Sequence, residues 1–433
     1  MQRILSFDQT PSLSAPLRFF LSAPLFAIVA AALLLWEGPN ALSSRWSPFT
    51  LALTHLITLG FLASTMIGAL IHILPVAAGI ALPRTELTAA VVHALLSTGA
   101  VLLAAAFWLS QTLLFKLALL FLLPAFIWLL AAGVIGLWRA PASGARATVA
   151  AIRLALAALT VTVVLGATLG SAFAWPSQFS FPLARLTDLH ALWGLFGWVG
   201  LLIVGVAYQV VPMFQVTAIY PRHLTRPLAS SLFVLLMLMT LADALLQGRF
   251  DWIRALLTSL IMLGFAWFAA TTLYLLAHRK RPKPDATTLF WRTAMASLLA
   301  GTALWITEQT TGRMSHPLTL GVLFLVGFAY SSINGMLYKI VPFLVWYHLQ
   351  TSLPGGCRSV PSVKQILPDK IAKKQFWLHL AALLLLLAAT LWPWALTRPA
   401  ALVLCASALW LWLNVFKATR IYWRLQGSTA LAA

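Results

Sequence analysis

Long apolar stretches alternate with short polar segments along almost the whole chain. Each stretch has about 20 predominantly apolar residues or more, which is the length an α-helix needs to cross the hydrocarbon core of a bilayer. The pattern predicts an all-α polytopic membrane protein with about 12 transmembrane helices. The predicted spans lie near residues 17–36, 47–74, 87–109, 112–138, 149–174, 187–213, 227–247, 253–277, 288–310, 317–347, 376–396 and 400–423.

One arrangement of glycine and proline occurs three times, with the spacing Gly-x7-Gly-x6-Pro. The copies fall in the second, sixth and tenth predicted spans, so each is the second of four spans when the chain is divided into thirds. We therefore expect a single membrane domain, 1–433, built from three pseudo-symmetric four-helix repeats at roughly 1–140, 141–282 and 283–433. The copies are Gly60, Gly68 and Pro75; Gly197, Gly205 and Pro212; and Gly327, Gly335 and Pro342.

Composition agrees with a membrane class, since 61% of the residues are hydrophobic and only 9% are charged. The formal net charge of +20 could indicate nucleic-acid binding. Most of the basic residues, however, fall in polar segments on one side of the membrane once the N-terminus is placed in the cytoplasm. This positive-inside distribution predicts a multi-pass protein of the bacterial inner membrane with both termini cytoplasmic. Its partner is then the lipid bilayer, and no nucleic acid is expected.

The two cysteines, Cys357 and Cys405, form no disulfide pattern and no CxxC metal or redox motif. The chain also has no CxxCH motif, so a covalently attached haem would have to belong to an associated subunit.

Histidines are the candidate cofactor ligands, because ionisable groups in hydrocarbon are costly and are functional candidates by default. We expect His72 and His93 to pack or hydrogen-bond near the inner ends of their spans. Four others lie in or beside inner loops and are expected at the interface, with no cofactor role. These four are His223, His278, His348 and His379.

Three histidines remain, and each lies in the outer part of the signature helix of its own repeat: His55, His190 and His316. One imidazole from each of three related helices is a geometry by which helical bundles hold a metal or cofactor. At about 100° per residue, His190 and His316 lie near the glycine stripe and His55 lies about 140° away. We predict all three as cofactor-binding and metal-ligating residues; the alternative is three hydrogen-bonded polar side chains near the outer interface.

At these residues the chain resembles subunit I of the haem-copper oxidases, most closely the C-family cytochrome oxidases, the nitric oxide reductases and the NnrS-like proteins. The resemblance lies in HLITLGFLASTMIGALIHILPV (55–76) and HALWGLFGWVGLLIVGVAYQVVPMF (190–214). It implies twelve helices in three arcs, with a low-spin haem ligand on the second helix, where His55 stands. It also implies a copper ligand on the sixth helix, close to His190.

The chain departs from that family at several ligand positions. Leu192 occupies the expected copper-ligand site of the sixth helix, and Val322 occupies a haem-ligand site of the tenth, where His316 lies a turn further out. The seventh span, LASSLFVLLMLMTLADALL, lacks the pair of copper-binding histidines that the family carries there. The resemblance therefore implies a divergent member without a complete oxygen-reducing haem-copper centre.

Two functions follow as hypotheses. The first is a haem-binding membrane protein that acts in electron transfer or in nitric oxide or oxygen chemistry. Haem b is its expected cofactor, and whether it also binds copper is left open. It would be an oxidoreductase only if it is an enzyme, and a respiratory-chain or c-type cytochrome would be its partner. The alternative is a membrane transporter or assembly factor for copper or haem on the same fold, since internal repeats also occur in transporters.

Overall fold

The computed structural model of the chain describes residues 11–78, 80, 82–138, 146–179, 182–246, 251–312, 316–352 and 360–430. Every regular element within these ranges is helical. Twelve segments of the described chain are long and apolar enough to cross a membrane. The predicted fold class is therefore confirmed.

The spans divide evenly among the three predicted repeats. The first four are α1 (Ser14–Glu37), the composite α2–η2–α3 (Pro48–His55, Leu56–Ala63, Ser64–Ala78), α4 (Thr85–Leu109) and α5 (Thr112–Trp138). The next four are α6 (Arg146–Ala174), α7–η3–α8 (Leu183–Leu192, Trp193–Gly200, Leu201–Gln215), α10 (Leu228–Leu246) and α11 (Asp251–Ala277). The last four are α12 (Ala286–Thr311), α13–η4–α14 (Pro317–Gly321, Val322–Tyr330, Ser331–Ser352), α16 (Asp369–Ala389) and α17 (Pro393–Ala430). Short helices η1 (Gly38–Leu42), α9 (Arg222–Thr225) and α15 (Val363–Ile366) lie between spans.

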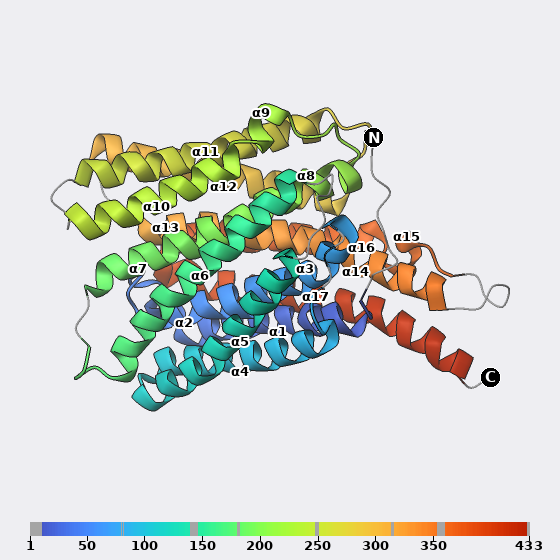
Figure 1. Cartoon of the computed structure of the whole chain (residues 1–433), viewed down its shortest axis with the longest axis horizontal. Helices are drawn as coiled ribbons and strands as arrows, with labels where there is room; N and C mark the ends of the chain where they lie inside the picture. The colour runs from blue at the N-terminus through green and yellow to red at the C-terminus, as the bar shows by residue number, and fades with distance from the viewer. Residues whose placement is uncertain are drawn as a thin grey trace.

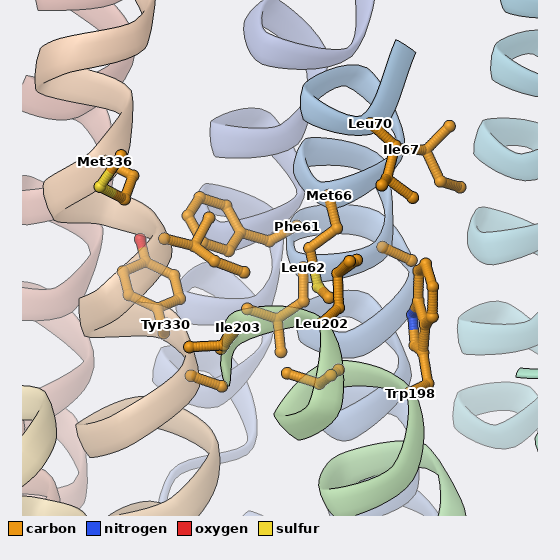
Figure 2. Close-up of a cluster of buried hydrophobic side chains, with 14 of the residues drawn as sticks. Phe61, Leu62, Met66, Ile67, Leu70, Trp198, Leu202, Ile203, Tyr330 and Met336 are labelled. Carbon is orange, nitrogen blue, oxygen red and sulfur yellow. The ribbon is translucent and has the colours of Figure 1, made fainter. Parts of the chain in front are cut away.

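The long helices run side by side along the long axis of the molecule (Figure 1). The first span, α1, packs against the last, α17, so the chain closes on itself. Between 72 and 78% of the best apolar window is buried in each of the three signature spans, against 33–56% in the other nine. The signature spans therefore form the centre of the bundle, and Figure 2 shows their side chains converging there.

The signature glycines make close helix packing possible. A Cβ added at Gly60 would lie 2.3 Å from Phe26 of α1, and one at Gly68 would lie 2.9 Å from Phe19. In each repeat both glycines face the first helix of that repeat, and the residues they face are seven positions apart. The other pairs are Gly197 with Ala158, Gly205 with Ala151, Gly327 with Ser297 and Gly335 with Phe290. The glycine stripe thus receives a neighbouring helix rather than a flat cofactor.

Each signature span also contains a π-helical segment, and the first signature glycine lies inside it in all three cases. These segments are η2, η3 and η4, and η4 contacts both of the others. A cavity of about 70 Å³ lies where the three spans meet. The fifth residue after the first glycine is Thr65, Leu202 or Ser332, and all three line this cavity. The three signature spans therefore share a π-helical segment and a residue that lines the central cavity.

The predicted spans agree with the observed helices to within a few residues, except at the eleventh and the twelfth. The twelfth is predicted at 400–423, whereas α17 begins at Pro393 and ends at Ala430. The eleventh is predicted at 376–396, whereas α16 begins at Asp369 and ends at Ala389. The first turns of α16 carry Asp369 and Lys373, which form an ion pair of 3.0 Å four residues apart. Charged residues in an entering helical turn resemble a loop in a hydropathy pattern, and this shifted the prediction towards the C-terminus.

Candidate functional site

The structure brings together two of the three predicted ligands, His55 and His190. Their ring centroids lie 6.3 Å apart, and the ring planes are inclined by 23°. His55 is the last residue of α2, and His190 lies near the end of α7. The two histidines are therefore contributed by the signature spans of the first and second repeats.

The two histidines pack against different helices. His190 packs against Gly166 of α6, the helix that Gly197 and Gly205 also face, and His55 stacks on Phe107 of α4. The predicted difference of about 140° between their faces does not keep the rings apart, because they belong to different spans.

Both imidazoles are held through the same nitrogen. His55 Nδ1 lies 2.7 Å from the carbonyl oxygen of Leu51, and His190 Nδ1 lies 3.1 Å from that of Thr162. A carbonyl oxygen can only accept a hydrogen bond, so Nδ1 carries the proton in both rings. In the neutral imidazole Nε2 then keeps its lone pair, which is the tautomer that ligates a metal.

The helix α6 shapes the space for His190. A Cβ at Gly166 would lie 2.9 Å from Cε1 of His190, so only glycine leaves room for the ring there. Phe107 of α4 lies over the other histidine, with its ring centroid 5.3 Å from that of His55 and a plane inclination of 21°. Nothing in the sequence pattern indicated that Gly166 and Phe107 lie beside the two histidines.

The outer ends of the signature spans are loosely packed. Ala52 is the one buried residue of α2, Leu189 is the one buried residue of α7, and α13 has none. In η2 and η3, by contrast, six of the eight residues are buried. His55 and His190 themselves are only partly covered by the protein.

A network of charges lies beside the pair. The carboxylate of Asp188, two residues before His190, accepts from Arg45 and from Arg254, the latter at 3.4 Å. Arg254 also reaches the buried carboxylate of Asp243 at 3.4 Å. These ion pairs join the loop before α2 to α7, α10 and α11, and so hold the helices that carry the two histidines.

His316 is held in a different way from the other two predicted ligands. It is the residue before α13, and its backbone N–H donates to Oε1 of Glu308 at 2.6 Å. Its Nδ1 lies 3.0 Å from the same carboxylate oxygen. Its described contacts are thus with α12 rather than with His55 or His190.

Two other polar residues of the membrane interior have definite partners. Lys339 forms an ion pair of 2.7 Å with Asp285. His93 Nε2 lies 2.9 Å from the hydroxyl of Ser22, which confirms its predicted hydrogen-bonded role.

The predicted interfacial position of His379 was wrong. The residue lies in the middle of α16 and is completely buried. The error follows directly from the shifted eleventh span, which placed His379 near the inner end of a helix rather than at its centre.

The structure brings two imidazoles together as candidate cofactor ligands. No group of three or more His, Cys, Asp or Glu side chains in the described ranges could hold a metal ion. The Nδ1 contacts of His55 and His190 leave Nε2 of each ring as the nitrogen that could hold a cofactor.

Comparison with known proteins assigns this chain to no family. A scan of protein-family models gave no match to this chain, and a search of curated proteins gave none either.

Proposed function

We propose that this chain is a multi-pass haem-binding protein of the bacterial inner membrane, with both termini in the cytoplasm, and that its function is electron transfer. The observation that carries the proposal is the His55–His190 pair, in which both Nδ1 atoms are anchored on carbonyl oxygens. The resemblance of residues 55–76 and 190–214 to haem-copper oxidase subunit I supports the same conclusion. The group implied is haem b, because no CxxCH is present to bind haem covalently.

His55 and His190 are the residues that would hold the haem, and haem bound there would supply one-electron redox chemistry. The protein's own contribution is to orient the two rings and fix their tautomer. The aromatic rings of Phe107 and its neighbours Phe115 and Phe173 exclude water on the side of His55. Haem held by two histidines would suit electron transfer better than nitric oxide or oxygen chemistry. Copper is the less favoured metal, because the pair lacks a third donor.

The test is the visible spectrum of the detergent-purified protein, oxidised and dithionite-reduced, with iron and copper measured on the same sample. We expect the sharp reduced bands of b-type haem and about one iron per chain in the simplest case. We also expect His55→Ala and His190→Ala to remove or shift these bands. His278→Ala is the matched control, since His278 is exposed and bonds only within its own helix.

The variant His316→Ala distinguishes His316 from the other two predicted ligands. Because His316 contacts Glu308, we expect its substitution to leave the haem bands unchanged. Haem retained in full by both the His55 and the His190 variants would refute the ligand assignment. Protein without iron, purified from cells supplied with haem, would refute the haem proposal and favour a transporter or assembly factor.

A further inference from the structure

The third repeat contains a line of buried polar side chains. We call it the third-repeat seam. It lies between α14, α16 and α17, whereas the His55–His190 pair belongs to α2 and α7. Its members are Tyr330, Ser331, Asn334, Tyr338, Gln375 and His379, and each is at least nine-tenths buried.

Helical geometry explains why these residues meet. At about 100° per residue, residues 330, 331, 334 and 338 lie within an arc of about 100° on one helix. Gln375 and His379 are four residues apart, so they share one face of α16. Ser332 points elsewhere, into the central cavity. The seam is thus a distinct face of α14, turned towards α16 and α17.

Several contacts fix the seam. His379 Nε2 lies 2.7 Å from the hydroxyl of Ser331, and the ring of Tyr330 stacks on the imidazole with centroids 5.4 Å apart. At the inner end Asn414 of α17 donates to the hydroxyl of Tyr338 at 2.9 Å. Gln375 donates to Ser407 of α17.

Five polar atoms of the seam have no hydrogen-bond partner among the described residues. They are Tyr330 Oη, Asn334 Oδ1, Asn334 Nδ2, Gln375 Oε1 and His379 Nδ1. Buried polar groups are almost always paired, with ordered water where protein groups do not reach. Asn334 is the extreme case, because both of its polar atoms are unpaired and the side chain is fully buried.

The other repeats show that this polarity is not required by the fold. The seventh residue after the first signature glycine is Asn334 in the third repeat, but Ile67 in the first and Val204 in the second. Both aliphatic residues are completely buried. An aliphatic side chain therefore fits this position of a signature helix, and the asparagine at this place needs another explanation.

The unpaired atoms define the chemistry of a ligand. They include an amide N–H donor and several acceptors, so the ligand must both donate and accept hydrogen bonds. No carboxylate, lysine or arginine belongs to the seam, so an ion would lack a counter-charge in the membrane interior. We infer that the third-repeat seam binds a cluster of internal water molecules, which joins His379 to the Tyr338–Asn414 pair and gives the imidazole at the membrane centre access to exchangeable protons.

A double-mutant cycle tests whether water couples the seam. In a dry interior, replacing an unpaired amide by an aliphatic residue is neutral or stabilising, and distant changes add. In a hydrated cluster, Asn334→Val and Gln375→Leu should each lower the thermal midpoint by about 2 °C or more. The double variant should lose clearly less than the sum. Thr65→Val is the control: its unpaired hydroxyl lies outside the seam, so its effect should add to that of Asn334→Val.

Proton exchange is the second measurement. The ring N–H signal of His379 in ¹⁵N-histidine-labelled protein is identified by its loss in His379→Gln, and its exchange is followed after transfer to D₂O. We expect exchange in the folded wild type, and exchange at least about tenfold slower in Asn334→Val/Gln375→Leu. Additive, neutral or stabilising substitutions would overturn the inference. So would a wild-type ring proton that persists for days, even if the double variant did not fold.

Discussion

The orientation of two imidazole rings is the residue-scale feature on which the proposed function rests. Leu51 and Thr162 contribute only backbone carbonyl oxygens to it. Substituting either side chain would therefore leave the hydrogen bond in place. A carbonyl acceptor of this kind fixes the tautomer, with the proton on Nδ1 and the lone pair on Nε2. The room for the ring, by contrast, depends on one side chain being absent, at Gly166.

Gly166→Ala should disturb the site without unfolding the protein. The added Cβ would lie 2.9 Å from Cε1 of His190, so the imidazole must shift. We expect haem bands that are shifted or reduced by about half or more, with overpacking lowering stability by about 1–3 kcal/mol. Gly321→Ala is the control, because a Cβ there meets nothing within 4 Å. Identical spectra for the two variants would argue that Gly166 does not position His190.

At the scale of elements, the composite signature span has one plan in all three repeats. A short outer helix leads into a π-helical segment that contains the first glycine, and a longer inner helix contains the proline. The π-helical segment changes which face the outer residues present, and the glycine pair brings the first helix of the repeat close. His55 and His190 precede the π-helical segment of their spans, where packing is loose. The arrangement shared by the three spans thus separates the candidate site from the tightly packed centre.

The inner end of α12 depends on a charged cap. Asp285 accepts from the backbone N–H of Thr288 at 2.8 Å and pairs with Lys339 of α14 at 2.7 Å. Burial by itself would raise the pKa of the Asp285 carboxyl. The Lys339 ammonium, its hydrogen bond and the hydrogen bonds from Thr288 outweigh burial and leave the pKa below its ordinary value. The charged form is therefore favoured by folding.

Asp285→Asn should make the protein less stable in a pH-dependent way. A carboxyl whose pKa is lowered by folding contributes stability above its unfolded pKa of about 3.9, and the contribution disappears as the pH falls through the lower folded pKa. We expect the thermal midpoint of the variant to lie a few degrees below that of the wild type at pH 6–7. The difference should shrink as the pH falls below about 4. A difference that is constant from pH 7 to pH 3 would show that the charge of Asp285 does not contribute.

At the scale of the whole molecule, an even number of spans places both ends of the described chain at one end of the bundle. The distribution of basic residues predicts that this end is cytoplasmic. The helices α2 and α7, which carry His55 and His190, lie towards the opposite end (Figure 1). A redox partner such as a c-type cytochrome would then meet the protein on its outer face.

Cysteine labelling tests this orientation. Ser177 lies in the exposed segment after α6, and Lys280 lies in the exposed segment after α11. In a background without Cys357 and Cys405, Ser177→Cys should react with a membrane-impermeant maleimide in intact cells whose outer membrane has been permeabilised. Lys280→Cys should react at least about tenfold more after the inner membrane is opened, because the bilayer core excludes the charged reagent. The reverse pattern would invert the orientation and place the histidine pair on the cytoplasmic side.

The sequence by itself determined the number of spans, their approximate limits and the three spans that carry the glycine–proline signature. A bilayer imposes a length and an apolar composition on each span, and close helix packing imposes glycine, so both leave a local record in the chain. His55 and His190 could be selected for the same reason, since a histidine in an apolar stretch is conspicuous.

Only the tertiary structure decided which of these residues meet. The packing of the spans brought His55 to His190, whereas His316 joined Glu308. Likewise, α16 begins at Asp369, among charged residues that a hydropathy pattern leaves out of a span. This start places His379 in the middle of the helix and within the buried seam. Contacts between helices far apart in the chain depend on helix rotation and register. A shift of a few residues changes both, and a local pattern does not record them.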